Sequence, residues 1–281
     1  MKHVLPALIC FFFLPFSGHA SGDPFPIGAR SLGLGNAVVT LRDAWSLFNN
    51  VGGLAGVVHP SAMASFSLQY NVVGLPVLAL GVVLPTRYGN AALAVQRFGD
   101  ELYSEQRAGL AYGHQIGNVS LGVKAEYLQI AASGLGSRGV LVLAFGGTVQ
   151  LLPTLRFGAY GYNLNQAKIS DFQDERVTTL IKAGVSYEPT PAVWLSAEVE
   201  RDVDFPTVIK AGLGYEVVKN LYVRTGVSSE PFTNHFGVGI AARHFCFDYA
   251  LTVHPQLGFS HHWSLQYSFE RKPTNQATQP N

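Results

Sequence analysis

The sequence has 281 residues and is 48% hydrophobic but only 13% charged, whereas soluble domains average about 25% charged residues. Its 19 Lys and Arg residues nearly balance 18 Asp and Glu residues, which argues against nucleic-acid binding because nucleic-acid-binding surfaces are strongly basic. Past the N-terminus no apolar run reaches the roughly 18 residues of a transmembrane helix. High apolarity without such a helix is typical of a membrane β-barrel.

Residues 1–20 have the pattern of a secretory signal peptide. Lys2 supplies the positive end, an apolar core follows, and Gly18-His19-Ala20 offers small residues for cleavage near Ala20. The alternative is an N-terminal membrane anchor. Cleavage would leave Cys246 as the single cysteine, so we expect no intramolecular disulfide and interpret Cys246 as a small packed residue.

Residues 21–60 are rich in glycine and do not alternate between polar and apolar positions. Around residues 42–48 the pattern favours a short helix, which Asn49-Asn50 and Gly52-Gly53 would end because Asn and Gly tolerate a left-handed backbone. We predict that this segment enters a barrel from the side of its short turns and plugs the lumen.

Residues 61–269 alternate repeatedly between apolar and polar side chains, as a strand with one lipid face and one lumen face does. In the last such run Trp263, Leu265 and Tyr267 share one face, and His262 and Ser264 share the other. We therefore predict an all-β fold, a transmembrane antiparallel β-barrel of 14 strands with a short helical plug. Twelve strands is the alternative, because residues 72–85 are almost uniformly apolar. The predicted strands are 61–70, 75–85, 90–98, 104–116, 118–129, 138–151, 154–163, 176–188, 191–200, 206–217, 220–228, 235–243, 244–254 and 260–269.

The predicted connections alternate in length, with short turns at one rim and longer loops at the other. In outer-membrane barrels the short turns are periplasmic. The longer segments are 99–103, 131–137, 164–175, 201–205 and 229–234. Residues 270–281 are expected to form a periplasmic tail.

Several charged residues have lumen-facing parity and are candidate ligand contacts together with Trp194. The alternative is a network of mixed charges that fills a narrow polar interior, with Trp194 packed on the plug instead of stacking on a ligand. The candidate contacts are Arg107, Lys124, Lys182, Trp194, Lys210 and Arg224, and the other lumen-facing charges are Glu126, Glu198, Glu216, Arg243 and Asp248.

No residue pattern predicts catalysis, a metal site or a cofactor. Ser260 and His261 near Asp248 could suggest a nucleophilic site, but nothing fixes a base beside an activated serine. His254, His261 and His262 match no metal-ligand spacing. We expect a non-enzymatic protein.

The segment before the first strand resembles the opening of PorV/PorQ-type proteins of the FadL-like outer-membrane superfamily. The run from Gly28 to Ala37 is similar to that opening, and Asp43-Ala44 with residues 50–55 is similar to the segment that follows it, although Val51 stands where the family has proline. Residues 224–226, 237–240, 248–250 and 257–265 are similar to the closing hairpins of that group. The plug motif comprises Gly28, Ala29, Arg30, Gly33, Gly35, Asp43, Asn50, Gly53 and Leu54.

The resemblance implies an outer-membrane protein of a diderm bacterium, in contact with outer-membrane lipid. PorV/PorQ proteins imply a docking or accessory barrel linked to type IX secretion, with secretion-system proteins or secreted cargo as partners. The wider superfamily implies a passive transporter of hydrophobic small molecules such as long-chain fatty acids. A structural protein without transport is a third hypothesis. The short predicted loops favour the secretion-linked function.

Overall fold

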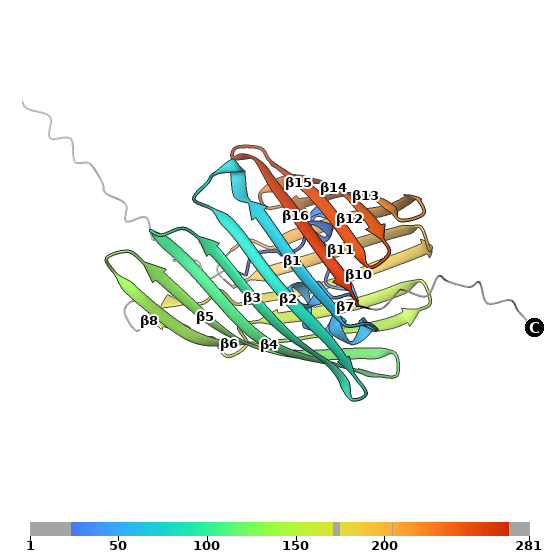
Figure 1. Cartoon of the computed structure of the whole chain (residues 1–281), viewed down its shortest axis with the longest axis horizontal. Coiled ribbons are helices and arrows are strands. Elements are labelled where there is room, and N and C mark those ends of the chain that lie inside the picture. The colour runs from blue at the N-terminus through green and yellow to red at the C-terminus, as the bar shows by residue number, and fades with distance from the viewer. Residues whose placement is uncertain (1–23, 171–174, 204, 270–281) are drawn as a thin grey trace, which may run out of the picture.

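A computed structural model describes residues 24–170, 175–203 and 205–269. In these residues fourteen antiparallel strands form one closed barrel, in which β1 (Ser61–Leu68) pairs with β16 (Gly258–Ser268) to complete the ring (Figure 1). The predicted fold class and the count of 14 are therefore confirmed. The signal peptide at 1–20 and the tail at 270–281 lie outside the described residues.

Each strand pairs with its neighbours in sequence, except that β7 pairs with β10. The remaining barrel strands are β2 (Pro76–Thr86), β3 (Gly89–Gly99), β4 (Tyr103–Ile116), β5 (Val119–Ala132), β6 (Gly136–Leu152), β7 (Leu155–Tyr162), β10 (Leu180–Thr190), β11 (Val193–Asp202), β12 (Val208–Val218), β13 (Leu221–Ser229), β14 (Phe232–Ala242) and β15 (Phe245–His254). Outside the barrel sheet, β8 (Lys168–Ser170) pairs with β9 (Glu175–Arg176), and the short helix η2 spans Gln69–Asn71.

The alternation of side chains places apolar residues on the outer face of the barrel. On β12, Leu213 is 40% exposed whereas the inward Lys210 is 5% exposed. The same contrast separates Phe247 from Asp248 on β15. Because water would oppose this arrangement and lipid favours it, the outer face is a membrane-facing surface.

Strand β2 is apolar on both faces, which is why residues 72–85 show no alternation. Val77, Ala79 and Val83 of β2 point inward and are buried in a core that includes Leu47 of the N-terminal segment. A Cβ added at Gly81 would lie 2.9 Å from Leu47 Cδ2. The plug thus supplies the apolar partner that the lumen face of β2 needs.

The two rims of the barrel differ less than the sequence predicted. One rim, the turn side, carries the short turns such as Gly117-Asn118 and Lys219-Asn220. The other rim, the loop side, carries residues 69–75 and the described residues 163–170 and 175–179. The expected loop at 229–234 is wrong, since β13 and β14 pair up to Ser229 and Phe232 and leave only Glu230-Pro231 between them. The segment 131–137 likewise shrinks to 133–135, because β5 and β6 continue pairing to Ala132 and Gly136.

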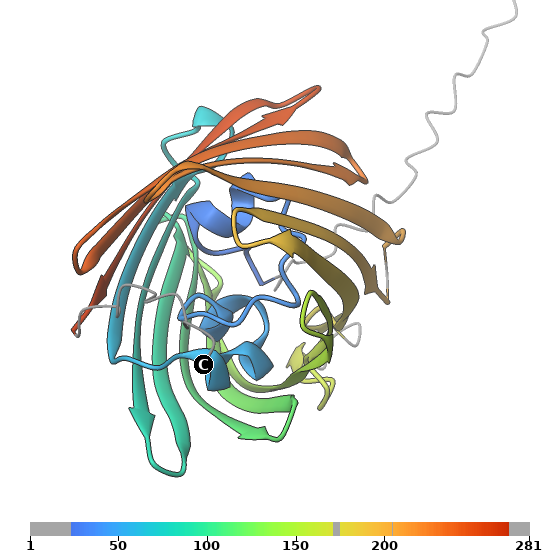
Figure 2. The same cartoon turned by 90° about the vertical axis from the view of Figure 1, so that its right-hand side faces the viewer.

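The N-terminal segment crosses the lumen and contains α1 (Ala29–Gly33), α2 (Ser46–Asn49) and η1 (Val51–Gly56). Figure 2 shows this segment, in blue, inside the ring of strands. Phe25 packs on Phe98 near the loop side, with ring centroids 4.2 Å apart, so the described segment runs from the loop side to the turn side. The sequence prediction that this segment enters from the turn side is therefore wrong. No helix among the described residues has the length and apolarity to cross a membrane.

The loop-side half of the lumen is apolar near β5 and β6, where the sequence predicted a polar interior. The inward residues Leu128 and Val142 are fully buried. Ala167, Ile169 and Val177 of the loop between β7 and β10 pack on the same core. The side chain of Asn163 fixes this loop by donating to Val177 O at 2.6 Å and accepting from Ala167 N at 2.8 Å. These described residues of the loop therefore face inward and cover apolar wall residues.

Candidate functional site

The lumen wall and the plug approach each other backbone to backbone at glycine positions. A Cβ added at Gly226 of β13 would lie 2.3 Å from Gly35 N, and one added at Gly122 of β5 would lie 2.3 Å from Val51 O. One added at Gly52 would lie 2.5 Å from Gly147 Cα of β6. Contacts this close exclude any side chain, so these glycines form a cradle for the plug backbone.

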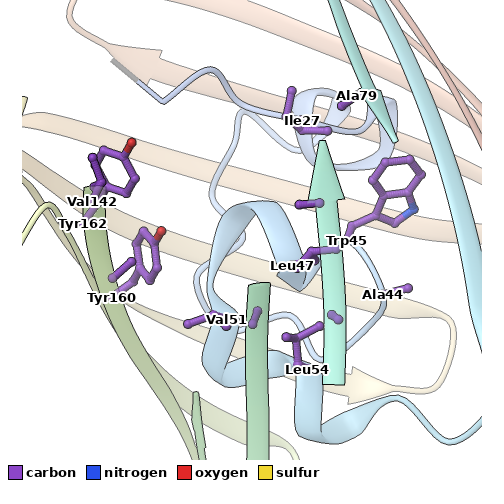
Figure 3. Packing of buried hydrophobic residues seen from close by; sticks show 14 of the residues in the cluster. Ile27, Ala44, Trp45, Leu47, Val51, Leu54, Ala79, Val142, Tyr160 and Tyr162 are labelled. Carbon is purple, nitrogen blue, oxygen red and sulfur yellow. The ribbon is translucent and has the colours of Figure 1, made fainter. Parts of the chain in front are cut away.

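The residues of the plug motif stabilise the fold of the plug itself. A Cβ added at Gly53 would lie 2.1 Å from Leu41 O, and one at Gly28, whose φ is 95°, would lie 2.9 Å from the Trp45 ring. Leu54 is fully buried, together with Ile27, Trp45 and Leu47 (Figure 3). Tight turns and close packing therefore explain the small residues of this motif.

Polar members of the motif tie the plug to itself and to the wall. Asn50 Nδ2 donates to Val39 O at 2.5 Å and to Gly147 O at 3.2 Å, while its Oδ1 accepts from Gly52 N at 3.0 Å. Arg30 and Asp43 form an ion pair at 2.9 Å. Ala29 N donates to Ser264 Oγ of β16, and Gly33 lies against Gly237 of β14. The structure thus gives these residues structural roles.

The predicted lumen charges meet one another in three clusters instead of facing an open pore. The first lies on β4, β5 and β7. Arg107 is 2.8 Å from Glu105 and 3.4 Å from Glu126, Lys124 pairs with Glu126, and Tyr162 Oη donates to Glu126 at 3.0 Å. This buried cluster matches the alternative interpretation of a mixed-charge network.

The second cluster connects β10, β11 and β12 and contacts the plug. Lys182 and Lys210 each lie 2.7 Å from the carboxylate of Glu200. Lys210 also lies 3.6 Å from Glu198, whose other oxygen accepts from Val38 N and Val39 N at 2.8 Å. Glu198 therefore joins the wall to the plug through charge-assisted hydrogen bonds.

The third cluster is the buried pair of Arg224 on β13 and Asp248 on β15, 2.7 Å apart. Trp194 packs on Leu34, Val38 and Leu41 of the plug, which is the second of the two roles considered for it. In sum, the structure places Arg107, Lys124, Lys182, Lys210 and Arg224 beside carboxylates.

A pocket of about 650 Å³, the loop-side pocket, opens between the plug and β10–β14. It has the size of sites that bind small molecules, which span roughly 300–1,000 Å³. Its walls are largely apolar, and Lys182, Glu200 and Lys210 also line it. The apolar walls are Pro24, Phe25, Pro26, Leu32, Leu180, Phe205, Pro206, Val208 and Pro231.

A second cavity of about 690 Å³, the turn-side cavity, lies beyond the plug at the other rim. Trp194 and Leu34 line it together with five arginines. The arginines are Arg30, Arg42, Arg156, Arg224 and Arg243, and the carboxylates are Asp43, Glu188 and Glu216.

The plug segment 32–42 separates these two spaces. Leu32, Gly35 and Asn36 line the loop-side pocket, whereas Leu34 and Leu41 line the turn-side cavity. Gly35 and Asn36 both have positive φ, 65° and 56°, so the chain reverses here within a few residues. The barrier is therefore one turn of backbone, seated on Gly212 and Gly226 of the wall.

The residues considered for catalysis do not come together in the described part of the chain. Ser260 Oγ accepts from Tyr70 N, His261 Nδ1 is 2.8 Å from Tyr249 Oη, and Asp248 pairs with Arg224. Among the described residues no group of His, Cys, Asp or Glu side chains could hold a metal ion.

The sequence analysis missed the apolar lining of the loop-side pocket. Two short Phe-Pro segments, Pro24-Phe25-Pro26 and Phe205-Pro206, carry its aromatic residues. An aromatic residue next to proline in a connection is a signal that the sequence offers for such a lining. Proline cannot donate a hydrogen bond to a neighbouring strand, so a phenylalanine beside it is not drawn into the sheet.

Comparison with solved structures identifies the fold. The chain is similar to the Pseudomonas putida toluene transporter TodX, with a TM-score of 0.61, 10% identity and coverage of 88% of this chain and 97% of that one. A TodX monoaromatic hydrocarbon channel with the deltaS2 mutation has a TM-score of 0.64, 12% identity and coverage of 88% and 100%. A Pseudomonas aeruginosa FadL homologue has a TM-score of 0.57, 11% identity and coverage of 89% and 100%.

No protein-family model and no curated protein matches the sequence. The identities are too low to carry a function across, and the likeness shows a FadL-like barrel fold. The resemblance to PorV/PorQ proteins remains a prediction from the motifs.

Proposed function

We propose that the chain is an outer-membrane conduit for hydrophobic small molecules, with the loop-side pocket as its binding site. The observation that carries the proposal is a pocket of about 650 Å³ with apolar walls, set inside a barrel whose structural neighbours include hydrocarbon channels. Apolar solutes gain about 25 cal/mol per Å² of surface removed from water. With the short turns in the periplasm, as in other outer-membrane barrels, this pocket faces the outside.

The plug makes the proposed conduit gated. A solute in the loop-side pocket meets Leu32, Gly35 and Asn36 before it can reach the turn-side cavity. Movement of this one turn of backbone would join the two spaces and leave the rest of the plug on its glycine cradle. The proposed transport is passive, since it needs only diffusion and a change in the position of this turn.

The secretion-linked docking function rests on the motif resemblance. The connection between β13 and β14 is a two-residue turn, and in the described part of the connection between β7 and β10, Ala167, Ile169 and Val177 pack on the buried core. Both features reduce the surface that the loop side offers to a protein partner. We therefore rank the small-molecule conduit function above the secretion-linked docking function.

The proposal is tested by filling the pocket. Val208 and Ile209 are neighbours on β12, but Val208 lines the pocket whereas Ile209 is 59% exposed on the outer face. We expect Val208→Trp to abolish toluene influx into proteoliposomes and Ile209→Trp to leave influx unchanged. Equal influx for wild type, both variants and protein-free liposomes would reject the conduit function.

A further inference from the structure

The loop-side pocket has two lysines at its base, and both are already neutralised. Glu200 lies between them, with its carboxylate 2.7 Å from Lys182 Nζ and 2.7 Å from Lys210 Nζ. Lys210 has Glu198 as a second partner at 3.6 Å. The side chains of Lys182, Glu200 and Lys210 are 12%, 17% and 6% exposed, so all three are held in the wall.

The remaining ionisable residues of the described lining add no further lysine or arginine. Asp202 and Glu230 line the pocket besides Glu200, against the two lysines. His235 also lines it, but both of its ring nitrogens lie 3.0 Å from threonine hydroxyls, those of Thr233 and Thr252. A ligand carboxylate in this pocket would therefore find, among the residues that the structure describes, no lysine that is not already paired with a carboxylate of the wall.

The apolar residues of the lining offer contact without charge. Phe25 and Leu32 come from the plug, Leu180 from β10, Phe205 from the connection before β12, and Val208 from the start of β12. An uncharged apolar ligand would gain from contact with these side chains without having to break an ion pair. A fatty-acid anion would gain the same contact and lose the hydration of its carboxylate, with no unpaired lysine in the described lining to compensate.

We propose that this pocket selects uncharged hydrophobic solutes over carboxylates of the same length, and that Glu200 enforces the selection by occupying Lys182 and Lys210. The inference rests on the proposed conduit function and specifies its substrate class. Glu200 is then a specificity-determining residue, because without Glu200 the two lysines would share only Glu198.

The test compares 1-decanol with decanoate, which share a chain length and differ in charge. Equilibrium binding of each radiolabelled ligand is measured on the full protein in amphipol. We expect the wild-type protein to bind decanol at least about tenfold more tightly than decanoate, a difference of about 1.4 kcal/mol. Equal affinity for the two ligands would overturn the inference, whereas binding of neither would reject the conduit function itself.

Variants test the role of Glu200. Glu200→Gln should raise decanoate affinity by about tenfold relative to decanol affinity. Glu216→Gln is the matched control, because Glu216 is also an inward carboxylate near β12's other end but lines the turn-side cavity. It should change neither affinity. A Glu200→Gln protein that binds decanol but gains no decanoate binding would contradict the role of Glu200.

A double variant separates excess positive charge from the mere loss of a carboxylate. Lys182→Met with Glu200→Gln removes one cation and one anion and leaves Lys210 paired with Glu198. We expect this protein to exclude decanoate as the wild type does. If it binds decanoate as well as Glu200→Gln alone, then exclusion is not set by the balance of charge, and the inference is wrong.

Discussion

The two spaces in the lumen are similar in volume, about 650 and 690 Å³, yet they differ in lining and in charge. The loop-side pocket has aromatic and aliphatic walls, with two lysines against three carboxylates. The turn-side cavity has five arginines against three carboxylates. One would hold an apolar solute, whereas the other is a polar vestibule.

The two linings stay distinct because an unbroken stretch of plug backbone separates the two spaces. Leu34 and Gly35 are adjacent, yet Leu34 lines the turn-side cavity and Gly35 the loop-side pocket. A barrier one turn thick can be moved by a small rearrangement, while the rest of the plug stays fixed by the buried core around Trp45 and Leu54.

The largest effect is expected from a side chain that pushes the barrier off its seat. A Cβ added at Gly212 would lie 2.5 Å from Leu34 O, so Gly212→Val must displace the plug at this turn. We expect ion conductance in planar bilayers to change from closed to persistently open, because the two spaces become joined.

Gly214→Val is the matched control, two residues along the same inward face of β12. The nearest heavy atom to a Cβ at Gly214 is 3.6 Å away, an ordinary contact. This variant should conduct like the wild type. Identical conductance for Gly212→Val and Gly214→Val would mean that the turn at Leu34 is not the barrier.

A smaller effect should follow from loss of the anchor at Glu198. Glu198→Ala removes the acceptor for Val38 N and Val39 N and one partner of Lys210. Removing one member of a buried ion pair costs about 3–5 kcal/mol. We expect faster hydrogen exchange at Val38 and Val39 and a lower unfolding midpoint in urea. Unchanged exchange at these two amides would show that other contacts hold the barrier.

The smallest of the three effects concerns the wall that both spaces share. Leu213 lies in the middle of β12 on the outer face, and Gly214 follows on the lumen face. Leu213→Arg should lower the free energy of unfolding in lipid by about 2–4 kcal/mol. Gly214→Ser should change it much less, since it places a small polar group in the lumen. Equal losses for the two variants would reverse the assignment of faces.

The strand pattern of this protein could be predicted from sequence because each strand has its own environment. Lipid outside and charge inside impose a period of two on every strand, and this is local information. For that reason β12, with Leu213 outward and Lys210 inward, was assigned correctly from its residues alone. Where the plug covers the lumen face, as at Val77 and Ala79 of β2, the inward residues are apolar too. The alternation of polar and apolar residues is then lost, and the strand is harder to predict from sequence.

The sequence by itself therefore determined the barrel and its outward face, whereas the choice of 14 strands over 12 came from the pairing of β2 with β1 and β3. Only the tertiary structure decided which lumen charges neutralise one another, because Lys182, Glu200 and Lys210 come from three strands whose register brings them within 2.7 Å. It also decided the path of the plug, because that path depends on close approaches between Gly35 and Gly226 and between Val51 and Gly122. Such contacts join residues far apart in the chain, and no local periodicity reports them.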